Sequence, residues 1–189
     1  FAAFVRPAWA DSTDADGGYI RRAFEDGVVS GDENGDFYAE KPVTRAEFAA
    51  MLVRFLGLRG RGFNTFSDVG AEDWFAPYIY TAAENGLIFG YEDGSVRPQS
   101  ILTCEDAVSV LGRFYKLGEN GAKRIKNVSD YAQTYYAYAL SNNLFGGRGS
   151  PYTDPQHYIT KGEVLALMYR YDLQSVSTIH FLSGYPKLS

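Results

Sequence analysis

The chain has 189 residues, 46% of them hydrophobic and 22% charged, with a formal net charge of −5 and a pI near 5.1. This length and charged fraction suit a folded domain or a tight array of repeats, and no apolar stretch approaches the roughly 20 residues of a membrane-spanning helix. The acidic balance argues against nucleic acid as a partner, and one cysteine with two histidines allows no internal disulfide and little metal binding, so we expect no cofactor.

The first ten residues, FAAFVRPAWA, form a short apolar stretch that ends in Ala8-Trp9-Ala10. This ending is typical of the cleavage end of a secretory signal peptide. No basic segment precedes it, so residues 1–10 are either the remnant of such a signal or a chance match.

The chain repeats itself. When it is shifted by 59 residues, 19–58 align with 78–117 without a gap, and 13 of the 40 positions are identical, which fixes the register. A further shift of 57 residues aligns 74–114 with 131–171, where Gly90, Pro98 and Thr103 meet the same residue types. Three units of 50 to 60 residues are therefore predicted.

Each unit opens with a predicted helix, at residues 17–26, 74–85 and 131–142. Gly27, Gly86 and Asn143 come directly after these helices, and glycine and asparagine are the residues that best adopt the left-handed conformation of a helix C-cap. A turn-rich loop and an extended stretch follow in every unit.

A second helix is predicted to begin after Thr44, Thr103 and Thr160. Its apolar residues follow the i, i+3, i+4, i+7 spacing of one helical face. Each start has the pattern of a capping box, in which the Thr hydroxyl accepts from the third helical amide and an acid three residues later accepts from the Thr amide. The acids of the three boxes are Glu47, Asp106 and Glu163.

The predicted fold class is mainly α, with helix–loop–helix repeats at 10–58, 64–117 and 123–173 and short glycine-rich linkers between them. A unit of about 50 residues can hardly bury enough apolar surface alone, so we expect the repeats to form one module. The tail at 174–189 is expected to pack across the repeats or to lead into another domain. Among apolar neighbours, Cys104 is predicted to be a small buried side chain.

Several motifs resemble the S-layer homology (SLH) repeat. The second unit has Phe66-Ser67-Asp68-Val69, Asp73-Trp74 and Gly86-Leu87-Ile88-x-Gly90, and the first has the family's tetrapeptide intact as Thr44-Arg45-Ala46-Glu47. Three tandem copies are the usual arrangement of the family, and here they cover the chain from about residue 10 to residue 173. The resemblance implies a pseudo-threefold, three-pronged assembly of helices with short extended loops and with binding grooves between neighbouring repeats.

The resemblance also implies a non-catalytic function, the anchoring of a secreted protein to the bacterial cell wall or S-layer through a secondary cell-wall polysaccharide, often one with pyruvate ketals. A helix N-terminus favours an anion, Arg45 and Lys161 would add a cation at such a position, and Trp74 could support a sugar face. The alternative is that Thr44-Arg45-Ala46-Glu47 is only a capping box and that Arg45 is solvated. The expected ligand-binding residues are Gly31, Thr44, Arg45, Glu47, Asp73, Trp74, Gly90, Thr160, Lys161 and Glu163.

The repeats depart from the family pattern in ways that lower the expected number of grooves. The second unit reads Thr103-Cys104-Glu105-Asp106, which replaces the cation with a thiol, and Lys161 in the third unit lacks the bidentate fork of Arg. Ala15 and Tyr131 stand where the second unit has Trp74. We therefore expect one or two working grooves.

Other chemistries fit the sequence poorly. Asp32-x-Asn34-x-Asp36 lacks the glycine and the final acid of an EF-hand, so a turn is predicted, and Gly146-Gly147-Arg148-Gly149 lacks the Lys-Ser/Thr pair of a P-loop. The spacing of Glu72-Asp73 does not set it apart from ordinary surface charge. A structural or self-assembly module that contacts other surface-layer subunits remains the alternative, and the aromatic-rich composition suits it.

Overall fold

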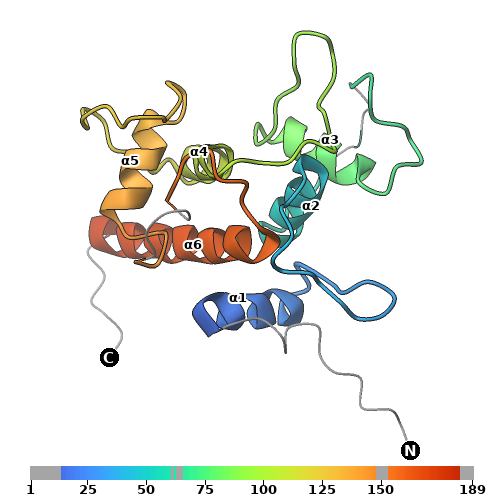
Figure 1. Cartoon of the computed structure of the whole chain (residues 1–189), viewed down its shortest axis with the longest axis horizontal. Coiled ribbons are helices and arrows are strands. Elements are labelled where there is room, and N and C mark those ends of the chain that lie inside the picture. The colour runs from blue at the N-terminus through green and yellow to red at the C-terminus, as the bar shows by residue number, and fades with distance from the viewer. Residues whose placement is uncertain (1–13, 61, 63–65, 148–152, 184–189) are drawn as a thin grey trace, which may run out of the picture. The chain divides into compact units, whose positions relative to one another are not determined.

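The computed structural model describes residues 14–60, 62, 66–147 and 153–183. The predictions for residues 1–10, for Arg148 and Gly149 and for the end of the tail lie outside these residues. Within the described part the chain forms helices and isolated bridges but no strand, which confirms the mainly α fold class (Figure 1). The helices are α1 (Asp14–Glu25), α2 (Arg45–Phe55), α3 (Ala76–Glu84), α4 (Cys104–Tyr115), α5 (Gln133–Ser141) and α6 (Lys161–Ser183).

The predicted C-caps are confirmed, since Gly27, Gly86 and Asn143 have φ values of 70°, 68° and 55°. The helices α3 and α5 begin two residues later than predicted, so that Trp74 precedes its helix instead of beginning it. The reason is a turn before α3, in which the carboxylate of Asp73 accepts from the amide of Gly70 at 2.8 Å and the Asp73 amide donates to the Gly70 carbonyl at 3.2 Å.

The helix α6 extends ten residues past the predicted end of the third repeat at 173. The helices α2 and α4 end where Gly57 and Lys116 turn left-handed, with φ values of 60° and 55°. The aligned residue in the third repeat is Leu173, which continues the helix, and 174–183 contain no glycine. Residues 174–183 of the predicted tail are therefore helical. No helix in the described residues is both long and apolar enough to span a membrane.

The chain divides into two compact units. Unit 1 comprises the chain up to Leu102 together with Tyr158–Leu165, and unit 2 comprises Thr103–His157 and the chain from Ala166 onward. In unit 1, α2 packs against α3 through a core that includes Phe48, Leu52 and Ile79. In unit 2, α4 packs against α5. Cys104 is only 1% exposed, which confirms the prediction that it is buried.

A closed ring of backbone hydrogen bonds joins the segment before α6 to the segments before α2 and α4 within unit 1. The residues that precede the three capping threonines are Val43, Leu102 and Ile159, and all three are buried. The Val43 amide donates to Ile159 at 2.9 Å, the Ile159 amide to Leu102 at 3.1 Å, and the Leu102 amide to Val43 at 3.1 Å. Residues at aligned positions thus have equivalent partners, as expected of three repeats. The three-pronged arrangement of the module stays a prediction.

Candidate functional site

All three predicted capping boxes are present. The Thr44 hydroxyl accepts from the Glu47 amide at 3.2 Å, and the Glu47 carboxylate accepts from the Thr44 amide at 2.9 Å. The same exchange joins Thr103 to Asp106 and Thr160 to Glu163. These side chains close the helix ends, which is the structural role that the sequence offered as the alternative for this motif.

The amides at the helix starts are not available to an anion, contrary to the expectation from the sequence. The first amide of α2, at Arg45, donates to Ser100 at 2.9 Å, and the next donates to Pro98 at 2.9 Å. In α6 the Lys161 amide donates to Lys41 at 3.0 Å. With the third amide held by the capping threonine, the donors that a helix end normally offers are already used by the protein itself.

A groove of about 500 Å³ lies in unit 1, between the loop after α1, the side of α2 and two side chains from the other repeats. Trp74 and Lys161 are those two side chains, and Gly31 and Glu47 also line it. Four of the ten predicted binding residues therefore come together in one place. The remaining lining residues are Val28, Val29, Ser30, Asp32, Asp36, Phe37, Tyr38, Ala50, Met51 and Arg54.

One wall of the groove is aromatic and apolar. Trp74 is 57% exposed, an unusual position for so large an apolar ring, and it packs edge-on against Phe75 with ring centroids 5.6 Å apart. The buried side chains of Ala50 and Met51 line the α2 side. Such a surface can cover the apolar face of a sugar ring while the polar groups beside it bind hydroxyls.

Two cations line the groove, and both have partners. The Lys161 ammonium lies 2.6 Å from a Glu47 oxygen. Half-burial works to raise the pKa of Glu47, but hydrogen bonds from Lys161 and Thr44 outweigh it and hold that pKa below its usual value. The Arg54 guanidinium donates to the Tyr78 hydroxyl at 2.7 Å and lies 4.7 Å from the centre of its ring.

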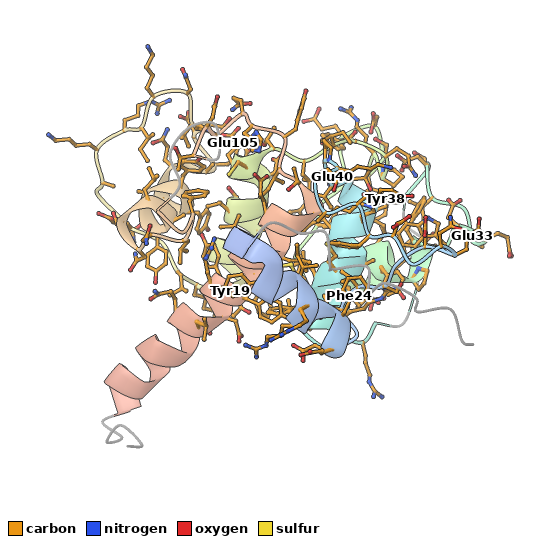
Figure 2. All side chains as sticks on the ribbon, turned by 60° about the horizontal axis from the view of Figure 1, so that its bottom comes forward. Tyr19, Phe24, Glu33, Tyr38, Glu40 and Glu105 are labelled. Atoms are coloured by element: carbon orange, nitrogen blue, oxygen red, sulfur yellow. The ribbon has the colours of Figure 1, made fainter. Side chains whose placement is uncertain are left out.

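The acidic side of the groove is a tight turn. Asp32 accepts from the amides of Asn34 at 2.8 Å and Asp36 at 3.0 Å, so the predicted turn is present. The Tyr38 hydroxyl, labelled in Figure 2, donates to Asp32 at 3.3 Å. At Gly31 a Cβ atom would come within 2.6 Å of the Gly35 carbonyl, so the loop can close only with glycine there.

Arg45 lies apart from the groove residues, against the second repeat's loop. Its guanidinium donates to the carbonyls of Val96 at 2.8 Å and Phe89 at 3.0 Å, and it lies 5.5 Å from the ring of Tyr91. Gly90 belongs to this loop. Arg45 and Gly90 are thus brought together. Unlike Lys161 and Gly31, Arg45 and Gly90 do not line the groove. The other predicted residues that do not line it are Thr44, Asp73, Thr160 and Glu163.

Sequence reasoning missed Arg54 and the Asp32–Tyr38 turn as groove residues. A signal for Arg54 was present, because Arg113 and Arg170 occupy the aligned positions. The structure explains in part why arginine recurs at this position. Arg54 donates to the Val28 carbonyl at 3.5 Å, and Arg170 donates to the carbonyl of Leu144, the residue aligned with Val28, at 3.1 Å. No comparable signal marked Tyr38.

The helix start in unit 2 is occupied by the protein's own side chains. Glu105, labelled in Figure 2, is only 4% exposed. It accepts from the Ser129 amide at 2.8 Å and hydroxyl at 2.7 Å, and from Gln156 at 2.9 Å. The Tyr131 hydroxyl, which stands where the second unit has Trp74, donates to Asp106 at 2.8 Å.

The fold is thus one of helical repeats joined by backbone hydrogen bonds, with a groove of aromatic and charged side chains in unit 1. Residues 10–49 and 65–107 match the S-layer homology domain. Both segments belong to the S-layer homology family, and the curated relatives of the chain include surface-layer and cell wall proteins of bacteria.

Curated relatives agree with this assignment. The chain is 35% identical to the middle cell wall protein of Brevibacillus brevis over 156 residues, which cover 79% of this chain and 14% of that protein. It is 31% identical to the cellulosome-anchoring protein of Acetivibrio thermocellus over 63% of this chain and 28% of that protein. It is also 31% identical to the exoglucanase XynX of Acetivibrio thermocellus, over 75% of this chain and 14% of that protein.

The chain spans less than a third of the length of each of these relatives. The match to the middle cell wall protein covers 79% of this chain. Residues 1–107 make up a smaller share than that, so the match must extend past residue 107, where the second family segment ends. Similarity to this cell wall protein therefore reaches into the third predicted repeat.

Proposed function

We propose that the module anchors its protein to the bacterial cell wall by binding, in the groove of unit 1, an anionic secondary cell-wall polysaccharide of the pyruvylated kind that the family resemblance implies. The observation that carries the proposal is the groove itself, in which a 57% exposed Trp74 shares one hollow with the ammonium of Lys161. An exposed indole beside charged and hydroxyl groups suits a sugar ring that bears an acid.

The names of the relatives support the anchoring role. One is a cellulosome-anchoring protein, another a middle cell wall protein and the third an exoglucanase, and the chain covers 28%, 14% and 14% of their lengths. A segment common to structural surface proteins and to an enzyme is best explained by a shared place of attachment. The catalytic work of such an enzyme then belongs to the part of it that this chain does not cover.

The proposal assigns the ligand contacts to other residues than the intact tetrapeptide suggested. Arg45, the cation of the intact tetrapeptide, holds two loop carbonyls and is assigned a structural role. Lys161 is assigned the acid-binding role, and Trp74 the sugar-stacking role. Arg54 lines the same groove and is held there by its hydrogen bonds to the Tyr78 hydroxyl and the Val28 carbonyl.

The test is co-sedimentation with Gram-positive sacculi, before and after removal of their secondary polysaccharide. We expect binding to need the polysaccharide, and to fall about tenfold or more in both Trp74→Ala and Lys161→Gln. Lys123→Gln is the matched control, because it removes the same charge from an exposed position of unit 2. Equal binding to stripped sacculi, or full binding by both groove variants, would contradict the proposal.

A second candidate function is self-assembly with other surface-layer subunits, which was the alternative that the sequence left open. The observation that favours it is the loop after α3, where Phe89 is 59% and Tyr91 42% exposed. Exposed aromatic side chains are typical anchors of protein interfaces. If Phe89→Ser abolishes assembly with surface-layer subunits while Trp74→Ala leaves sacculus binding intact, this function replaces the first.

A further inference from the structure

We propose that Glu47 is an internal counter-ion of Lys161 that an acidic ligand must displace, and that Glu47 thereby sets how tightly the groove binds an acidic glycan. The inference rests on the proposed function, because it concerns the regulation of the same groove. Its starting point is the 2.6 Å contact between the Lys161 ammonium and one Glu47 oxygen.

The two oxygens of the Glu47 carboxylate have separate partners. Oε2 accepts from the Thr44 amide at 2.9 Å and from the Thr44 hydroxyl at 3.1 Å, which closes the cap of α2. Oε1 takes the Lys161 ammonium. Because the cap holds the carboxylate through Oε2 alone, Lys161 can be released without opening the end of the helix.

The pair is placed where a ligand would meet it. The side chains of Lys161 and Glu47 are 17% and 27% exposed, and both line the groove. A partly buried pair is screened by salt much less than an exposed one. An acid bound to any of the three N–H donors of Lys161 would lie within roughly 5 Å of the Glu47 charge and be repelled by it.

Two more acids line the same groove. Asp32 and Asp36 belong to the loop after α1, and Asp32 is held by backbone amides in its turn. The apolar neighbour is Phe37, whose ring centre lies 5.9 Å from the Lys161 ammonium. Among these acids Glu47 has its carboxylate 2.6 Å from the Lys161 ammonium, so removal of its charge should change the reactivity of Lys161 most.

The second capping box shows that capping and this outer contact are separable. Asp106 caps α4 through Oδ2, which accepts from the Thr103 amide at 3.2 Å. Its other oxygen accepts from the Tyr131 hydroxyl at 2.8 Å in place of a cation. The outer partner differs between the two boxes while the cap is the same, so a neutral Gln at position 47 can retain the cap, as Gln does in capping boxes generally.

The variants follow from this geometry. Glu47→Gln is expected to bind a pyruvylated wall polysaccharide roughly tenfold more tightly than the wild type, because it removes a charge-assisted competitor. Glu47→Asp keeps the charge on a shorter side chain, one that caps well at Asp106, and should fall between the two. Lys161→Gln should weaken binding, and Asp106→Asn is the matched control that should leave it unchanged.

The experiment has one arm without ligand and one with it. In the first, the full chain is treated with acetic anhydride, and the acetylation rate of Lys161 is followed by peptide mass spectrometry. We expect Lys161 to react several-fold faster in Glu47→Gln than in the wild type, whereas Lys123 reacts equally in both. Equal rates at Lys161 would overturn the inference and leave the proposed function standing.

In the second arm, calorimetry measures the affinity for a purified pyruvylated polysaccharide and for the same polymer after mild acid removes its ketals. Tighter binding by Glu47→Gln that disappears with the ketals supports the inference. Unchanged or weaker binding by a folded Glu47→Gln overturns it while the wild type still binds. Failure of the wild type to bind either polymer would reject the proposed function and the inference with it.

Discussion

The start of α6 in unit 1 and the start of α4 in unit 2 have the same capping box but different surroundings. After Thr160 comes Lys161, whose ammonium reaches Glu47 at the edge of a groove of about 500 Å³. After Thr103 come the buried thiol of Cys104 and the carboxylate of Glu105, which accepts four hydrogen bonds from three side chains and one amide.

The difference teaches that the tetrapeptide is first a structural element. Thr and its acid cap the helix in both units, and the first amides of each helix donate to a neighbouring loop. Under the proposed function, ligand binding depends on the residues between Thr and the acid and on the loop that lies opposite. The number of tetrapeptides in the sequence is then not expected to equal the number of binding grooves.

We expect the largest loss of stability from a change at Glu105, which is buried at the start of α4. Glu105→Ala leaves the Ser129 and Gln156 donors without their buried acceptor, so we expect a loss of about 3 kcal/mol in the free energy of unfolding. Urea denaturation measures it, with exposed Glu72→Ala as a control that should change stability by less than about 0.5 kcal/mol. A Glu105→Ala protein as stable as the control would show that this carboxylate does not hold unit 2 together.

The next effect concerns the loop that the groove requires. Gly31→Ala places a methyl group 2.6 Å from the Gly35 carbonyl, so the backbone must move, at a cost of about 2 kcal/mol and with loss of polysaccharide binding. Gly18→Ala is the matched change in α1, where a Cβ meets nothing within 4 Å, and it should stabilise the protein by about 0.5 kcal/mol. Thermal unfolding separates the two, and equal shifts would contradict the account of the loop.

A smaller loss of stability is expected from changes in the threonine caps, which α2 and α4 have in common. Thr44→Ala and Thr103→Ala each remove a hydroxyl that accepts from the third helical amide, so each should lose about 1 kcal/mol of unfolding free energy. The two losses should agree, because the caps are alike in both units. A loss at Thr44 several times that at Thr103, measured by urea denaturation, would mean that the caps are not equivalent.

The smallest effect is the pH dependence of the Lys161–Glu47 pair. Because the folded pKa of Glu47 lies below its unfolded value near 4.5, the pair contributes its full stability above about pH 4.5 and loses it as the pH falls through the folded pKa. Lys161→Gln should therefore cost up to about 1 kcal/mol at pH 7 and less at pH 3. A difference that grows towards pH 3 would have the wrong sign for this pair.

Much of the scaffold could be predicted from the sequence, because it depends on local chemistry. Capping threonines, left-handed residues such as Gly27 and the aligned register each leave a pattern along the chain. The groove could be predicted only in part, since Trp74, Glu47 and Lys161 belong to three repeats and meet through tertiary contacts. The structural role of Arg45 was beyond reach, because its partners are backbone carbonyls, which carry no sequence signal.

The central claim is that the polysaccharide binds in the groove of unit 1, and amide chemical shifts measured while polysaccharide is added test it most directly. If the polysaccharide binds there, the largest changes should fall on residues 28–38, on the Trp74 indole and on Lys161, with little change at 103–106. Changes centred on 103–106, or spread over the exposed aromatic loop at Phe89 with none at Trp74, would contradict it.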